Sequence, residues 1–187
     1  MVAAYIVIAV VVLLVVWYIA ANNSLIRACN KVDEAWSGID VQLKRRHDLI
    51  PNLVETVKGY AAHEQQTFQR VTEARAQAIA AENAPPAERS KAESGLSTAL
   101  GQIRAVAEQY PQLRATENFQ QLQAQLTETE DQIQAARRIY NSNVQIYNTR
   151  IQIFPNSLVA ARGDFEEREF FEIEVPSERD VPAVSFS

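Results

Sequence analysis

The hydrophobic positions of this 187-residue chain follow two patterns that meet near residue 23. Residues 2–21 read VAAYIVIAVVVLLVVWYIAA, which is an unbroken apolar run. From Leu25 onward, apolar residues recur instead at steps of three and four, the period of an amphipathic α-helix. The first pattern is typical of a membrane-spanning helix, and the second predicts a helical domain in water.

The apolar run is long enough to cross a bilayer, because about 20 residues that rise about 1.5 Å each span a hydrocarbon layer about 30 Å thick. Trp17 and Tyr18 fall near its far end, where aromatic side chains prefer the headgroup level. A cleaved signal peptide is the alternative, but no Lys or Arg precedes the run, and Ile19-Ala20-Ala21 is a poor cleavage triplet. We predict a transmembrane anchor over residues 1–23.

Charge indicates on which side of the membrane the rest of the chain lies. Residues 1–26 carry no charged side chain, so all 18 Lys and Arg residues follow the anchor. Because Lys and Arg are enriched in cytoplasmic flanks, we expect the soluble domain in the cytoplasm. Basic residues near the bilayer can also contact anionic headgroups, at about 1 kcal/mol each. These candidates are Arg27, Lys31, Lys44, Arg45 and Arg46.

A stripe of apolar residues at helical spacing predicts a long first helix. Its positions are Leu25, Cys29, Val32, Trp36, Ile39, Leu43, Ile50, Leu53, Val57 and Tyr60, and the spacing resumes at Phe68 and Val71. The heptad phase continues across Pro51, although proline deprives the carbonyl of His47 of its helical hydrogen bond at a cost of about 3 kcal/mol. We expect a kink near residues 47–50; a break, with Pro51 opening a new helix, is the alternative.

Turn residues divide the remainder of the chain. Pro85-Pro86 cannot continue a helix, and Tyr110-Pro111 marks a second turn. Between them lies a weaker helical stripe that contains Leu96, Leu100 and Ile103. The best stripe follows and stops at Pro155; it consists of Phe119, Leu122, Leu126, Ile133, Ala136, Tyr140, Val144, Tyr147, Ile151 and Phe154. Short helical turns are predicted over residues 157–162 and 165–173.

These stripes must bury against one another, which predicts an all-α fold. The transmembrane helix continues into an elongated antiparallel helical bundle over residues 24–175. Sustained heptads also support coiled coils between copies, so we expect a homo-oligomer. Residues 176–187 form an extended tail in which Val184 and Phe186 alternate with serines. We expect this tail to pack on the bundle or on a neighbouring copy, with a frayed terminus as the alternative.

The two long stripes should meet in a seam, by which we mean the interface between the two long helices. We expect Tyr140, Val144, Tyr147 and Phe154 to face Trp36, Ile39, Leu43, Leu53 and Tyr60 there. The pairs Tyr140-Asn141 and Tyr147-Asn148 repeat at seven residues, which places the asparagines beside the stripe. Buried polar groups need partners, so we predict a polar seam of Asp40, Asp48, Asn141 and Asn148. A ligand or partner groove lined by these residues is the alternative.

Candidate catalytic chemistry is sparse. The residues three positions before His47 and His63 are Lys44 and Tyr60, so the Glu-x-x-His pairs of di-iron bundles are missing. The single Cys29 cannot form a disulfide within the chain, and it reads as a small buried hydrophobe, with lipid attachment as the alternative. A net charge of −5 disfavours nucleic acid as a partner. We therefore expect no enzyme, no metal, no cofactor and no small-molecule substrate.

Three ordered motifs resemble the LemA family. They are W-x-x-I-D-x-x-L-x-R-R-x-D-L-I-P-N-L-V-E-x-V-K-G-Y-A-x-H-E over residues 36–64, Y-P-x-L-x-A over residues 110–115, and A-R-x-x-Y-N-x-x-V-x-x-Y-N from residue 136 with F-P at 154–155. The resemblance implies a single-pass protein of the bacterial inner membrane with a helical-bundle domain and no established enzymatic activity. It also implies a relative in magnetosome membranes and frequent gene neighbourhood with HtpX-type membrane metalloproteases, one candidate class of membrane protein partner.

The leading functional hypothesis is a non-enzymatic, membrane-anchored scaffold or adaptor that acts through self-assembly or through a membrane protein partner. A membrane-shaping homo-oligomer is the alternative, and a cryptic metal-dependent hydrolase is the third reading.

Overall fold

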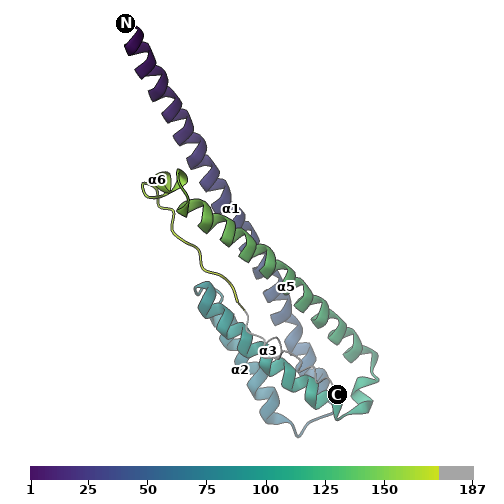
Figure 1. Ribbon diagram of the computed structural model, residues 1–187. Coiled ribbons are helices and arrows are strands. Elements are labelled where there is room, and N and C mark those ends of the chain that lie inside the picture. Colours follow the sequence, from purple (N-terminus) through teal and green to yellow (C-terminus); the bar gives the residue numbers. More distant parts are fainter. Residues whose placement is uncertain (173–187) are drawn as a thin grey trace, which may run out of the picture.

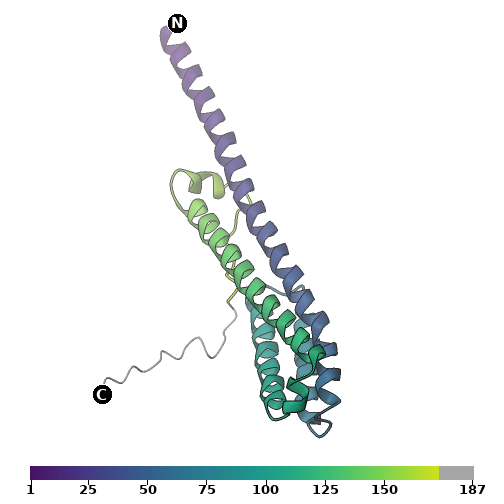
Figure 2. The same ribbon diagram turned by 90° about the vertical axis from the view of Figure 1, so that its right-hand side faces the viewer.

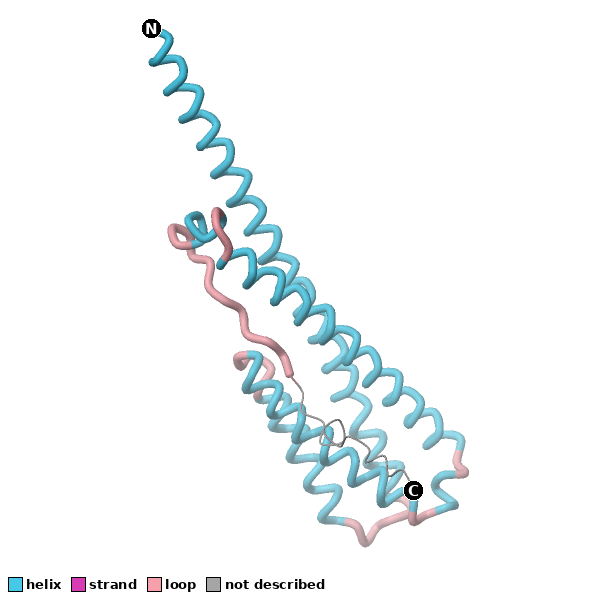
Figure 3. The backbone as a smooth tube through the Cα atoms, in the orientation of Figure 1, coloured by secondary structure: helices cyan, strands magenta, loops and turns pink. Residues whose placement is uncertain are grey.

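The computed structural model describes residues 1–172, and within that range every regular element is an α-helix (Figure 1, Figure 3). This confirms the all-α fold class predicted from the hydrophobic pattern. In chain order the helices are α1 (Val2–Lys58), α2 (Gln65–Ala80), α3 (Pro86–Glu108), α4 (Pro111–Arg114), α5 (Glu117–Gln152) and α6 (Asn156–Ala160).

Helix α1 has 57 residues and joins the apolar N-terminal run to the bundle without a break. Its first part extends alone beyond the other helices (Figure 1, Figure 2). Among the described residues, α1 is the one helix long and apolar enough to cross a membrane, and its apolar window is exposed. The alternative in which Pro51 begins a new helix is wrong, because α1 continues through that proline to Lys58.

The bundle is built around two clusters of buried side chains. In the proximal cluster, which is nearer the N-terminus, α1 residues such as Leu25 and Ile39 pack with α5 residues such as Val144 and with α6. In the distal cluster, the end of α1 packs with α2, α3 and the first part of α5. Helices α1 and α5 lie side by side over most of this length (Figure 1, Figure 2).

The predicted continuation of the first stripe to Phe68 and Val71 is wrong in one respect. Helix α1 ends at Lys58, and these two side chains belong to a separate helix, α2, in the distal cluster. Gly59 follows α1 as its C-cap, in accordance with the weak helix propensity of glycine. Helical spacing can persist across a loop, so the stripe alone could not locate this break.

The carbonyl that Pro51 deprives of a helical partner is supplied with another one. Because Pro51 has no N–H, the carbonyl of His47 has no donor four residues on. Arg75 of α2 donates from Nε to that oxygen at 2.7 Å, in a partly buried position. A tertiary hydrogen bond therefore replaces the missing backbone bond where α1 passes through its proline.

The chain after α6 is extended rather than helical, which corrects the prediction of helical turns over residues 165–173. Residues 165–172 carry no regular secondary structure and run back along the bundle as a thin strap (Figure 3). We call these residues the strap. The helical prediction failed because the strap takes its hydrogen bonds from side chains of α5, as described below. The tail predicted for residues 176–187 lies outside the described residues.

Candidate functional site at the helix seam

The seam between α1 and α5 is centred on three aromatic rings from three parts of the chain. Trp36 of α1 lies 5.0 Å from Tyr140 of α5, between ring centroids. Phe171 of the strap meets Trp36 edge to face at 5.4 Å and is fully buried. Such pairs contribute about 0.5–1.5 kcal/mol beyond the area that they bury. The remaining predicted seam residues that the structure buries in this proximal cluster are Ile39, Leu43, Val144 and Tyr147.

Two asparagines of α5 hold the strap by its backbone. Asn141 Nδ2 donates to the carbonyl of Phe171 at 3.1 Å, and its Oδ1 accepts from the Phe171 N–H at 2.9 Å. Asn148 makes the same two bonds with Arg168, both at 2.9 Å. A carboxamide has an N–H donor and an oxygen acceptor side by side, so it can pair with the C=O and N–H of an extended backbone as a neighbouring strand would. The asparagine pair bonds only to the main chain of the strap in these contacts, so the hydrogen bonds do not depend on the identity of the strap's side chains.

The seven-residue spacing of the asparagine pair matches the strap in length. Seven residues of helix advance about 10.5 Å, and the three residues from Arg168 to Phe171 advance about 10 Å when extended. The strap therefore runs antiparallel to α5 with both asparagines in register. Asn141 and Asn148 therefore have polar partners as predicted, and these partners are backbone groups of the strap. The groove that the two asparagines line is occupied by the strap itself.

Tyr140 adds a third hydrogen bond to the strap. Its hydroxyl donates to the carbonyl of Glu169 at 2.9 Å. Burial, above all, raises the pKa of Tyr140 to about 12, so the phenol keeps its donor proton throughout the neutral range. The position of Tyr140 in the stripe thus serves both packing and recognition of the strap.

The two aspartates predicted for the polar seam lie elsewhere. Asp40 is partly exposed and pairs with Arg89 of α3, whose guanidinium also lies 5.2 Å from the ring of Trp36. Asp48 is exposed. Both predictions fail for the same geometric reason: these positions of α1 do not face α5, where the asparagine pair lies.

Arg46 was predicted to face lipid, but the structure buries it completely. Its guanidinium pairs with Glu93 of α3, donates to Glu130 of α5 at 3.0 Å and donates to Ser97 at 3.1 Å. His47 Nε2 lies 3.0 Å from the other oxygen of Glu93. We call Arg46, His47 and Glu93 the buried ionic cluster. A buried guanidinium needs such partners, which explains why one arginine of three consecutive basic residues turns inward.

Competing effects set the ionisation of Glu93. Its burial raises the pKa, but the hydrogen bond from His47 and the charges of Arg46 and His47 together outweigh it, so the pKa of Glu93 lies below its usual value. The carboxylate therefore stays charged beside Arg46. Glu93 is not among the residues predicted for the seam, although its position three residues before Leu96 continues the buried stripe of α3 and marks an inward-facing acid.

Three further residues of the predicted seam need correction. Tyr60 is 46% exposed because α1 ends at Lys58, before the stripe reaches it. Phe154 is 77% exposed because α5 ends at Gln152 and the chain turns away into α6. Leu53 is buried, but in the distal cluster with α2, α3 and the first part of α5, and not beside the predicted tyrosines of α5.

The other basic candidates lie on the surface. Arg27, Lys31, Lys44 and Arg45 are exposed, and Arg45 pairs with Glu128 of α5 at 3.3 Å. A pocket of about 190 Å³ brings Arg27 and Lys31 together with Arg150 of α5. Their contact with lipid stays a prediction.

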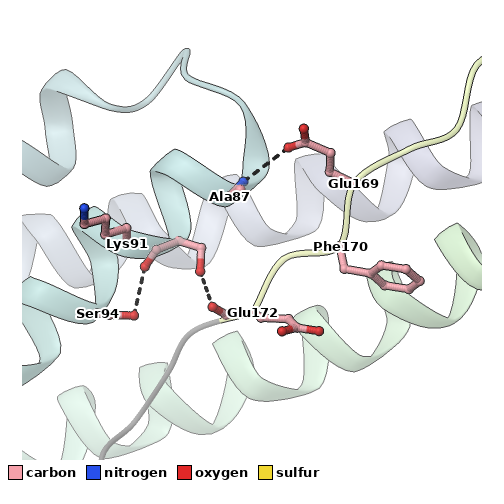
Figure 4. A pocket seen from close by; sticks show the side chains of 7 residues that line it. Ala87, Lys91, Ser94, Glu169, Phe170 and Glu172 are labelled. Carbon is pink, nitrogen blue, oxygen red and sulfur yellow. Dashed lines mark hydrogen bonds between the residues drawn. The ribbon is translucent and has the colours of Figure 1, made fainter.

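A larger pocket, of about 620 Å³, lies between the first half of α3 and the strap (Figure 4). Ala87 donates its N–H to Glu169 at 3.5 Å on one side of it, and Ser90 donates to the carbonyl of Glu172 on the other. Lys91 and Ser94 complete its α3 wall. The strap thus bridges α5 and α3 at its C-terminal end. Within residues 1–172, no group of three His, Cys, Asp or Glu residues is placed to hold a metal ion.

These features define an all-α protein with one exposed apolar N-terminal helix that runs into a bundle closed by a strap. The family model described as LemA family matches residues 35–186, and the chain belongs to that family.

Relatives include two magnetosome proteins of Paramagnetospirillum magneticum, MamQ 1 and MamQ 2. Each is 26% identical over 174 residues, covering 80% of this chain and 64% of the relative. Protein LemA of Metamycoplasma hominis is 28% identical over 149 residues, covering 79% of this chain and 67% of that one. The chain thus spans less than two thirds of the length of the two magnetosome relatives.

Proposed function

We propose that this protein is a non-enzymatic scaffold or adaptor, anchored in a bacterial inner membrane, that acts through self-assembly or through a membrane protein partner. The observation that carries the proposal is the continuity of α1: one helix contains both the exposed apolar run and the core positions of the bundle. A helix without an intervening linker transmits position and orientation from the bilayer to the bundle, which is what a scaffold requires.

The interior of the bundle supports a structural role for its polar residues. The asparagine pair, the hydroxyl of Tyr140 and the buried ionic cluster all direct hydrogen bonds to other parts of the same chain. They tie α1, α3, α5 and the strap together. The surface and the anchor are therefore the parts we assign to partners, and a membrane metalloprotease is one candidate class of partner implied by the family resemblance.

The proposal includes the side of the membrane. All 18 Lys and Arg residues follow residue 26, and Arg27 and Lys31 are exposed directly after the apolar run, which favours a cytoplasmic bundle. Protease added to intact spheroplasts should leave the bundle uncut, as it leaves a cytoplasmic control protein. Digestion of the bundle while that control survives would reverse the orientation.

A membrane-shaping homo-oligomer is a second candidate that one surface favours. Ile139 and Ile146 of α5 are exposed, at 59% and 47%, one heptad apart. Beside them a pocket of about 420 Å³ is bounded by Ala35, Gly38 and Ala136, whose small side chains leave room for a side chain of another helix. Copies anchored in the same membrane would meet through this face side by side.

Purification from native membranes in mild detergent tests the proposal. We expect stoichiometric recovery of further copies or of another membrane protein, identified by mass spectrometry and chemical cross-linking. Isolation of the intact chain as a monomer without partners would remove the basis for the scaffold.

A paired substitution separates the two modes of action. Changing Ile139 and Ile146 together to lysine should abolish contacts between copies if the homo-oligomer is correct. Val41→Lys is the matched control, because Val41 of α1 is also an exposed apolar residue, at 64%. If the double variant assembles as the wild type does, this face of α5 is not the contact between copies. The adaptor, acting through a different partner, would then be favoured.

A further inference from the structure

The corner between α5 and α6 exposes three large apolar side chains at one place. Ile153, Phe154 and Leu158 are 50%, 77% and 57% exposed. All three lie between the end of α5 and the middle of α6, a stretch of six residues. We call these three residues the apolar corner. Exposed apolar residues gathered in this way mark a contact surface.

The register of α5 against α1 gives the height of the apolar corner. Asn143 Nδ2 donates to the carbonyl of Lys31 at 3.2 Å, and Arg150 Nη1 donates to Ser24 Oγ at 3.4 Å. A step of seven along α5 thus matches a step of seven back along α1. Two further residues bring α5 to its end at Gln152, which is level with Asn22, so the apolar corner begins at about that height.

The packing of α6 agrees with this height. Val159 and Ala160 of α6 are buried in the proximal cluster together with Ala21, and Trp17 packs against the same cluster. Helix α6 therefore lies against the last turns of the apolar run, where α1 becomes part of the bundle (Figure 1). The apolar corner therefore lies at the height where the exposed apolar run ends.

The charges around the corner are mixed, because Glu167 accepts from Gln152 at 2.7 Å, and three basic residues lie where they can meet anionic headgroups. Arg150 converges with Arg27 and Lys31 on a pocket of about 190 Å³ on the side of the corner away from the N-terminus. Interfacial elements commonly place apolar and aromatic residues in the headgroup boundary with basic residues just behind them.

We propose that the apolar corner is a second membrane contact, which inserts shallowly into the lipid beside α1 and fixes the tilt of the bundle. This inference rests on the proposed function, because it requires that residues 2–21 span the bilayer. This second membrane contact explains why Phe154 continues the heptad stripe yet points out of the bundle, since its partner is lipid.

Spin labels on the full-length chain can test this contact in vesicles of phosphatidylethanolamine and phosphatidylglycerol. In a Cys29→Ser background, single labels are placed by Phe154→Cys and Leu158→Cys. Two positions are used so that a local disturbance at one does not decide the result. Collision rates are measured with molecular oxygen, which concentrates in lipid, and with a water-soluble nickel chelate.

Ser142→Cys is the matched control, because Ser142 is exposed on α5 about 15 Å farther from the apolar run than the end of that helix at Gln152. We expect the oxygen-to-nickel ratio at both corner positions to be severalfold higher than at Ser142. A ratio equal to that at Ser142 would place the corner in water, and low rates with both reagents would show that another protein surface covers it. Either result overturns the proposal.

A label at Val10→Cys distinguishes this failure from failure of the proposed function. If Val10 is in lipid while the corner is in water, the anchor holds and the second contact alone is overturned. If Val10 collides freely with the nickel chelate, the anchor and the inference that depends on it both fail.

Discussion

Tyr147 and Tyr60 each continue a stripe of apolar residues at helical spacing, but they lie in different environments. Tyr147 is 1% exposed in the proximal cluster, whereas Tyr60 is 46% exposed beyond the end of α1. Replacing a packed aromatic residue by alanine costs about 3–5 kcal/mol, and surface changes usually stay within about 0.5 kcal/mol. We expect Tyr147→Ala to lower the free energy of unfolding by about 3–5 kcal/mol and Tyr60→Ala to lower it by about 0.5 kcal/mol. Chemical denaturation of both variants measures this difference, and equal losses would contradict the packing described here.

Glu93 links the stability of the bundle to pH. Because its pKa is lower in the folded protein than the ordinary value of 4.5, its contribution is fully present above that value and is lost as the pH falls through the lowered pKa. Glu93→Gln removes the fully buried charge that pairs with Arg46, while Glu130 still pairs with it, so we expect a cost of about 1.5–3 kcal/mol at neutral pH. The loss should shrink under acid conditions, because the wild-type carboxylate is then protonated as well.

The melting temperatures of the wild type and of Glu93→Gln, measured across the acid range, test this dependence of stability on pH. Glu108→Gln, at an exposed position of the same helix, serves as the control and should follow the wild type. A Glu93→Gln curve parallel to the wild-type curve at every pH would show that Glu93 does not carry this dependence.

At the scale of an element, α1 depends on α2 where Pro51 interrupts its hydrogen bonds. The bond from Arg75 to the carbonyl of His47 is charge-assisted and partly buried, so Arg75→Met should cost about 1.5–3 kcal/mol. In a Pro51→Ala background, the alanine N–H supplies the missing helical donor, and the same change should cost clearly less. A double-mutant cycle by denaturation measures the coupling, and additive effects would show that the two residues act independently.

The strap is the element most dependent on single side chains. Asn141→Ala removes two hydrogen bonds to Phe171, each contributing about 0.5–1.5 kcal/mol. We expect faster amide exchange at Phe171 and a loss of about 1–3 kcal/mol in stability. Gln145→Ala, at an exposed position of α5, is the control and should leave the exchange unchanged. Unaltered protection at Phe171 in Asn141→Ala would mean that packing against Trp36 alone holds the strap.

Elements with strong helical periodicity could be predicted from the sequence, and those held by tertiary contacts could not. Helix α5 and the bundle part of α1 follow from their stripes, and the Pro-Pro pair marks the break before α3, which begins at Pro86. The strap could not be predicted, because its hydrogen bonds come from Asn141 and Asn148 rather than from its own neighbours. Arg46 cannot be told from Arg45 by residue type, but its spacing, three residues after Leu43 and four before Ile50, places it on the buried stripe, where Glu93 of another helix supplies its partner.

At the scale of the molecule, α1 is a rod of about 85 Å at 1.5 Å per residue that the other helices surround only over its second part. The proximal cluster begins at Ala21, where the exposed apolar run ends. Bundle and apolar run therefore abut with no spacer. In a membrane this places α6 at the lipid boundary and the distal cluster farthest from it.

A membrane anchor requires that residues 1–21 remain part of the mature protein and hold it in the bilayer. The most direct test is the intact mass of the protein purified from native membranes after an alkaline carbonate wash, which strips peripheral proteins. We expect that the chain resists the wash and that its mass includes the apolar run. A mature protein that begins after Ala21, or one that the wash releases, would contradict it.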